Sequence, residues 1–137
     1  MTEGRPQVLL VDDARTILEL ERSILEPAGY ALTLAGSAEE ARQLLEHLDP
    51  KVVVLDVMMP GISGIEFCQE LRATARFARV AIIMVTSQTE EESVEAAYLA
   101  GCTDYLTKPI ERAELLAKVA QYARGGGAAG PDTRGAG

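Results

Sequence analysis

One stretch of the sequence joins an unbroken apolar run to a single acid: Val52-Val53-Val54-Leu55-Asp56-Val57-Met58-Met59-Pro60. Consecutive aliphatic residues without polar alternation are typical of a strand that is buried on both faces, as in a parallel sheet covered by helices. The acid and a loop follow at the carboxyl end of this strand, which is the end where ligands collect in open parallel sheets. We therefore expect Asp56 at the functional edge of a sheet, provided that the other strands run parallel to this one.

Strands and helices alternate along the rest of the chain. Apolar runs predict strands at residues 7–11, 30–35, 52–56, 80–85 and 104–107, and helical periodicity predicts a helix after each of them, the last one ending near Arg124. Connections of this length favour right-handed units of strand, helix and parallel strand rather than hairpins. The sequence therefore predicts one doubly wound α/β domain, with five parallel strands and helices on both faces.

Local signals predict where several helices begin and which side they bury. Residues 37–40 and 63–66 match the capping box, in which a serine and a glutamate satisfy free amides at a helix start, and 89–92 is a similar start. On the first helix, the spacing of apolar residues predicts one inward-facing position that either Leu20 or Glu21 occupies.

Composition limits the possible classes of protein. With 137 residues and a net charge of −8, the chain fits one domain, expected over residues 1–124, followed by a flexible Gly-rich tail or linker at 125–137. The acidic balance argues against direct binding of nucleic acid. No stretch has the length and apolar character needed to insert into a membrane, and the N-terminus lacks the apolar core of a signal peptide, so we expect a cytoplasmic protein. Cys68 and Cys102 stand singly in apolar surroundings and are expected to be buried free thiols.

Polar groups follow four of the five predicted strands and should meet at one edge of the sheet. They are Asp12, Asp13, Asp56, Thr86 and Lys108. Converging carboxylates repel one another unless a cation lies between them. Hard oxygen ligands without a nearby histidine or cysteine suit Mg²⁺. The sequence therefore predicts a magnesium site that carries a lysine and a hydroxyl group beside it.

Such a site has the groups needed to move a phosphoryl group onto an aspartate. Mg²⁺ and Lys108 would neutralise the oxygens of the transferred group, Thr86 would donate a hydrogen bond to one of them, and Asp56 would attack the phosphorus in line. The product would be an acyl phosphate on Asp56, which water removes again.

The ordered motifs resemble the receiver domain of two-component response regulators over roughly residues 6–124. The resemblance is carried by 11–13 (Val-Asp-Asp), by 56–60 (Asp-Val-Met-Met-Pro) with Gly64, by Thr86, and by 101–109 (Gly-Cys-Thr-Asp-Tyr-Leu-Thr-Lys-Pro). It implies a flavodoxin-like (βα)5 fold with strand order 2-1-3-4-5 and a cis bond before Pro109.

The resemblance also implies roles for individual residues. Asp56 would be the phosphoacceptor. Asp13 and Asp56 would ligate Mg²⁺ directly, Asp12 mostly through water, and Met58 through its backbone carbonyl. Thr86 and Tyr105 would form a switch that alters the face made by the fourth helix, the fifth strand and the fifth helix.

A protein of this kind is a signalling phosphoacceptor rather than an enzyme, with only its own phosphorylation and dephosphorylation as chemistry. Its implied partners are a sensor histidine kinase or phosphotransfer protein and a downstream protein target. We favour a stand-alone regulator; the alternative is the receiver portion of a longer response regulator cut in its linker.

Two other functions fit the sequence less well. Phosphohydrolases with an aspartate nucleophile generally carry a second acid two residues later, and that position is Met58 here. A nucleotide- or flavin-binding domain is disfavoured because the chain lacks the Gly-rich phosphate-binding motifs.

Overall fold

The computed structural model describes residues 4–87 and 91–124. The tail expected at 125–137 and the first part of the helix start expected at 89–92 lie outside these residues. The sheet has five parallel strands in the order β2-β1-β3-β4-β5, which confirms the predicted fold class and strand order. The strands are β1 (Gln7–Val11), β2 (Ala31–Ala35), β3 (Val52–Asp56), β4 (Ala81–Ser87) and β5 (Asp104–Lys108).

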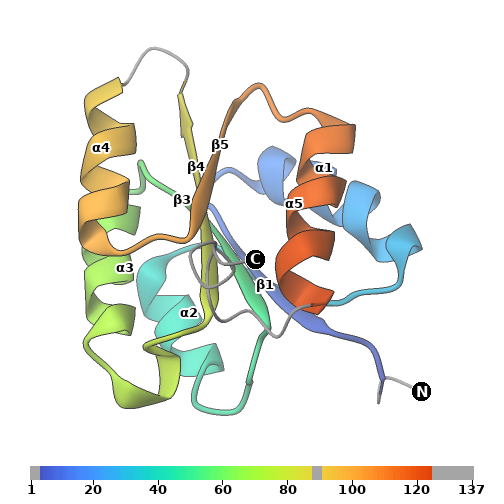
Figure 1. The fold of residues 1–137 in the computed structure, drawn as a ribbon, viewed down its shortest axis with the longest axis horizontal. Coiled ribbons are helices and arrows are strands. Elements are labelled where there is room, and N and C mark those ends of the chain that lie inside the picture. Colours follow the sequence, from blue (N-terminus) through green and yellow to red (C-terminus); the bar gives the residue numbers. More distant parts are fainter. Residues whose placement is uncertain (1–3, 88–90, 125–137) are drawn as a thin grey trace, which may run out of the picture.

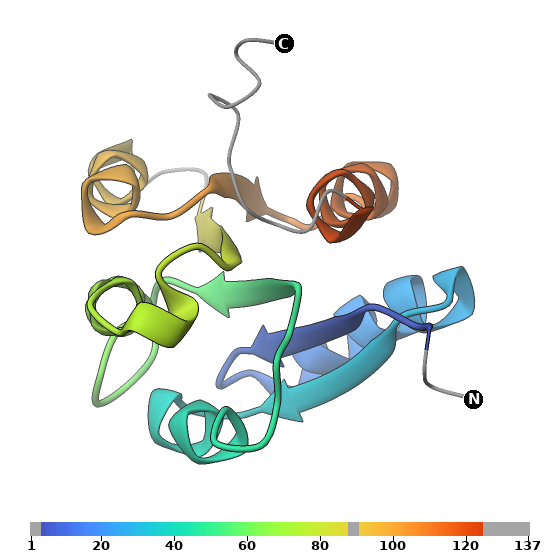
Figure 2. The same ribbon diagram turned by 60° about the horizontal axis from the view of Figure 1, so that its bottom comes forward.

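Helices cover both faces of the sheet (Figure 1). Helices α1 (Arg15–Leu25) and α5 (Arg112–Arg124) pack on one face, and α2 (Ala38–Leu44), α3 (Gly64–Arg72) and α4 (Glu91–Ala100) lie on the other, as the turned view also shows (Figure 2). Two short 3₁₀ turns, Glu26–Ala28 and Ala75–Phe77, follow α1 and α3. Within the described residues, no helix has the length and apolar character of a membrane span.

The central strands place their side chains alternately in two apolar layers. Leu9, Val53 and their neighbours pack toward α2, α3 and α4, whereas Leu10 and Val54 pack toward α1 and α5. All five residues of β3 are buried, as its unbroken apolar run predicted. Because alternate residues of a strand face the same side, Asp12 and Asp56 continue the rows of Leu10 and Val54 toward α1 and α5.

The helix starts agree only partly with the predicted capping boxes. At α3 both bonds of the box are present: the Glu66 amide donates to the Ser63 side chain and the Ser63 amide to the Glu66 carboxylate. At α2 the Ser37 hydroxyl accepts a hydrogen bond from the Glu40 amide as predicted, but the Glu40 carboxylate accepts its bond from the amide of Gly36 instead of Ser37. The second half of that predicted box is therefore wrong.

Helix α2 ends at Leu44, although leucines continue at helical spacing to Leu48. Arg76, which lies in the 3₁₀ turn after α3, donates hydrogen bonds to the carbonyl groups of Leu45 and Leu48, both at 2.6 Å. These carbonyls would otherwise need partners from a continued helix or from water. A distant arginine thus provides hydrogen bonds where the helix stops.

Candidate functional site

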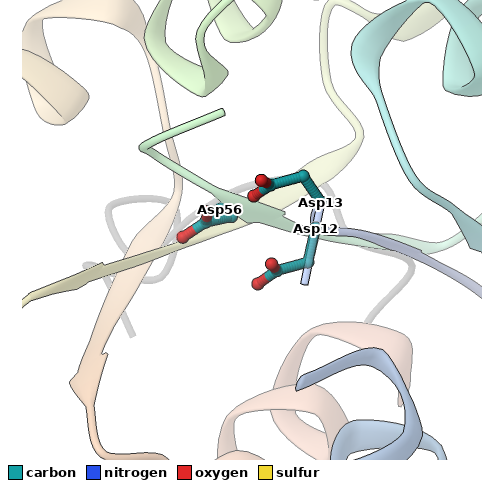
Figure 3. Close-up of side chains that lie close together, drawn as sticks. All are labelled: Asp12, Asp13 and Asp56. Atoms are coloured by element: carbon teal, nitrogen blue, oxygen red, sulfur yellow. The ribbon is translucent and has the colours of Figure 1, made fainter. Parts of the chain in front are cut away.

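Three carboxylates meet where β1 and β3 end (Figure 3). Asp12 and Asp13 directly follow β1, and Asp56 is the last residue of β3. Each offers an oxygen that lies within 4.8 Å of the other two. Asp12 and Asp56 are only 1% and 3% exposed, whereas Asp13 is open to solvent. The structure therefore brings together the three acids that the strand ends predicted.

The loop after Asp56 brings the start of α3 close to the end of β3. The amide of Gly64 donates a hydrogen bond to the carbonyl of Val57 at 2.9 Å. A Cβ at position 64 would collide with the backbone carbonyl of Asp56. The first turn of α3 can therefore approach the end of β3 only because residue 64 has no side chain.

Lys108, the last residue of β5, completes this edge. Its Nζ lies 3.2 Å from Oδ1 of Asp56 and 3.9 Å from Oδ2 of Asp12. Burial alone would lower the pKa of Lys108, but Asp56 and Asp12 outweigh it and raise this pKa overall. The following bond, Lys108–Pro109, is cis as predicted.

The carboxyl groups bear more negative charge than one lysine balances. Burial, followed by the charge of Asp12, raises the pKa of Asp56 to about 6 although Lys108 acts in the opposite direction. Burial is also the main cause that raises the pKa of Asp12. One oxygen of Asp12 accepts a hydrogen bond from the Ala14 amide at 2.8 Å, and the other, Oδ2, has no hydrogen-bond partner among the described residues.

These observations fit a divalent cation. A buried carboxylate oxygen without a hydrogen bond, next to two more carboxylates, is a place where a hard cation satisfies both charge and coordination. Asp12, Asp13 and Asp56 are the residues that would hold it. No soft ligand belongs to this group of carboxylates, so its donors suit Mg²⁺.

The two predicted switch residues lie on neighbouring strands. Thr86 of β4 is 2% exposed, and its Oγ1 has no hydrogen-bond partner within the part of the chain that the structure describes. Tyr105 of β5 is partly buried, and its ring meets that of Tyr98 on α4 edge to face, with centroids 5.7 Å apart. Their roles, like that of the Met58 carbonyl, stay predictions.

Sequence reasoning did not assign a role to Glu21, which the structure places inside the protein. Glu21 is 1% exposed, whereas its neighbour Leu20 is 41% exposed. Burial, followed by the charges of Asp12 and Asp56, raises the pKa of Glu21 to about 8. The signal that could have found it was the helical spacing, which left this inward position open.

The two cysteines are buried and free, as predicted. Burial raises the pKa of Cys68 to about 11 and that of Cys102 to about 12. Raised pKa values keep both thiols in the protonated form, which is the less reactive one.

Comparison with known proteins identifies the family. The model of the response regulator receiver domain matches residues 8–120. The chain belongs to this family. Receiver domains are the phosphoacceptor modules of two-component systems and interact with histidine kinases, so this chain is a signalling domain of that class.

Individual relatives support the same assignment. An uncharacterized 14.6 kDa protein from Leptolyngbya boryana is 38% identical over a region that spans 88% of this chain and 92% of that protein. The crystal structure of a putative response regulator from Chloroflexus aurantiacus has a TM-score of 0.83 at 35% identity, with 88% of this chain and 98% of that chain covered. The receiver domain of the sensor histidine kinase PA1611 from Pseudomonas aeruginosa has a TM-score of 0.81 at 28% identity, covers 88% and 98%, and has a magnesium ion coordinated in its active site cleft.

Several relatives are longer than the matched region. The chain spans about half the length of the DNA-binding regulators that it matches, for example 47% of RpaA from Synechocystis.

Proposed function

We propose that Asp56 accepts a phosphoryl group from a histidine kinase or phosphotransfer protein in the cytoplasm, in a Mg²⁺-dependent reaction. The observation that carries this proposal is the buried Asp56 carboxylate, which stands within 4.8 Å of two further acids and 3.2 Å from Lys108. The family assignment and the magnesium ion in the PA1611 receiver domain support it.

In this reaction an oxygen of Asp56 attacks the phosphorus, and the bond from phosphorus to the donor's histidine nitrogen breaks. The electron pair of that bond leaves with the imidazole. Mg²⁺, held by Asp12, Asp13, Asp56 and the Met58 carbonyl, would supply positive charge to the phosphoryl oxygens. Lys108 supplies a second positive charge and leaves Asp56 for the new phosphoryl oxygens.

Burial of Asp56 also favours a reactive carboxylate. Few water molecules reach a group that is 3% exposed, so the nucleophile is poorly solvated once the cation and Lys108 hold it ionised. The apolar strand β3 fixes its position, because all of its residues are packed on both sides.

The signal would leave the site through Thr86 and Tyr105. Thr86 Oγ1 lacks a hydrogen-bond partner among the described residues, so a phosphoryl oxygen on Asp56 would offer it one. Movement of Thr86 would open space for the Tyr105 ring, which now packs against Tyr98. The face of α4, β5 and α5 would then change and bind a downstream protein.

Phosphorylation with a small acyl-phosphate donor and Mg²⁺ tests the proposal. Intact-mass spectrometry should show one added phosphoryl group on the wild type and none on Asp56→Asn. Asp49→Asn is a matched control, because it removes an exposed carboxylate at the opposite end of the sheet. Equal labelling of Asp56→Asn and the wild type would refute the assignment of Asp56.

The comparisons support two arrangements of output. The 92% coverage of the Leptolyngbya protein supports a receiver domain that acts alone through a separate partner, which we favour. The coverage of about half of RpaA supports attachment to an effector domain. An immunoblot of lysate from the native cells distinguishes the two arrangements by the apparent molecular mass of the protein.

A further inference from the structure

Glu21 is a buried acid on the same side of the sheet as the side chains of Asp12 and Asp56. It lies on α1, whose neighbouring inward residues Leu18, Ile24 and Leu25 belong to the apolar layer between the sheet and α1 and α5. An ionised glutamate that is 1% exposed in such a layer is costly unless it is paired with a positive charge. On the outer side of the same helix, Arg15 and Arg22 form ion pairs with Glu19 rather than with Glu21.

Two carboxylate oxygens on this side of the sheet lack hydrogen bonds. They are Oε1 of Glu21 and Oδ2 of Asp12, and the statement covers the described residues. In Figure 3 the Asp12 carboxyl lies on the side of the strands where α1 and α5 pack, and the Asp13 carboxyl lies on the other side. Buried polar atoms in native proteins almost always have a partner. Oδ2 of Asp12 has the Lys108 ammonium at 3.9 Å, and Oε1 of Glu21 has no hydrogen bond among the described residues, so this side of the sheet has more carboxylate groups than positive charges to balance them.

The charges that act on Glu21 are those of the site itself. Asp12 from β1 and Asp56 from β3 repel its ionised form, and Lys108 from β5 attracts it. Glu21 in turn acts on Lys108, whose pKa it helps to raise. Glu21 therefore belongs to the same electrostatic cluster, although it lies on helix α1 and not at a strand end.

We propose that Glu21 is a positioning residue of the cation site, which strengthens divalent-cation binding at Asp12, Asp13 and Asp56 without touching the cation. This inference rests on the proposed function. A carboxylate in the poorly screened interior attracts a doubly charged ion over several ångströms. It also balances Lys108, which otherwise competes with the cation for Asp12 and Asp56.

The effect is reciprocal by linkage: a cation in the site stabilises the ionised form of Glu21, and the ionised form strengthens binding of the cation. Neither glutamine nor leucine can supply that charge. The alternative is that Glu21 is a tolerated core residue without influence on the site.

Titration with MgCl₂ at pH 8.5 and constant ionic strength, followed by amide shifts in NMR spectra, tests the inference, because Glu21, whose pKa is about 8, is then largely ionised. Glu21→Gln keeps the shape of the side chain and removes its charge, and Glu21→Leu removes both polarity and charge. Both variants should bind Mg²⁺ at least about three-fold more weakly than the wild type. Glu19→Gln makes the same charge change on the outer side of α1 and should stay within about two-fold of the wild type.

Asp13→Asn separates the possible failures. If the wild type shows no Mg²⁺ binding, the proposed function fails and this inference with it. If Asp13→Asn loses binding while both Glu21 variants equal the wild type, only the inference is overturned. If Glu21→Gln loses binding as completely as Asp13→Asn, Glu21 is a ligand rather than a positioning residue, and the inference is overturned as well.

Discussion

Replacing Glu21 by leucine should stabilise the protein when no divalent cation is present. The pKa of Glu21 is about 8 in the folded state and 4.5 as the ordinary value of an unfolded chain. Between pH 4.5 and pH 8, Glu21 is protonated in the folded protein and ionised in the unfolded chain. Folding therefore requires the uptake of a proton, which becomes less favourable as the pH rises. Each pH unit in this window costs about 1.4 kcal/mol.

The expected size follows from this window. Below pH 4.5 Glu21 is protonated in both states and has no such effect on stability. From pH 4.5 to 8 its contribution lowers the free energy of unfolding, and above pH 8 this contribution is constant. The cost is about 3 kcal/mol near pH 7 and about 5 kcal/mol above pH 8. Leucine is apolar like the surrounding residues, and imperfect packing of its side chain should reduce the gain in stability by about 1 kcal/mol. We therefore expect Glu21→Leu to be about 2 kcal/mol more stable near pH 7, with a Tm higher by roughly 5–10 °C.

Urea unfolding in EDTA, followed by far-UV circular dichroism, measures this difference near pH 5, 7 and 8.5. The two proteins should be similar near pH 5, and the advantage of Glu21→Leu should grow toward pH 8.5. Glu19→Gln, which alters an exposed acid on the same helix, should follow the wild type at every pH. A difference between Glu21→Leu and the wild type that does not change with pH would refute the reasoning, because the proton on Glu21 would then have no part in stability.

Three further substitutions have defined outcomes. Gly64→Ala should cost about 3 kcal/mol or more in urea unfolding and weaken Mg²⁺ binding, because its Cβ collides with the Asp56 carbonyl. Arg72→Met should cost about 2–4 kcal/mol in the same assay, because the guanidinium hydrogen-bonds the Gly101 carbonyl at 2.7 Å and three other acceptors. Lys108→Met should raise the pKa of Asp56 above about 6 in a carboxyl NMR titration with EDTA, since Lys108 now lowers it.

Matched controls make these outcomes specific. Gly36→Ala places its Cβ at an ordinary 3.6 Å from one side-chain oxygen and should cost less than about 1 kcal/mol. Arg15→Met removes an exposed arginine and should be nearly neutral. Asp12→Asn should shift the pKa of Asp56 downward, opposite to Lys108→Met, because Asp12 now raises it. Shifts of the same sign in both variants would contradict the electrostatic account of the site.

The amino-acid sequence by itself determined the fold class and most of the site. Unbroken apolar runs mark strands that are buried on both sides, and helical periodicity between them leaves only parallel crossovers. Because parallel strands end at one edge, the acids after β1, the acid of β3 and the lysine of β5 were expected at that edge, and the strand order implied by the receiver-domain resemblance makes these strands near neighbours. Asp12, Asp13, Asp56 and Lys108 could therefore be predicted as a group before any distance was known.

Only the tertiary structure decided which contacts cross between distant segments. Leu20 and Glu21 are adjacent on the edge of a helical face, and the packing of α1 on the sheet buries the acid. The end of α2 depends on Arg76, more than thirty positions away, and the absence of a side chain at Gly64 matters only because α3 approaches Asp56. Local patterns contain no information on such contacts, since periodicity reports which side of an element is apolar and not what lies against it.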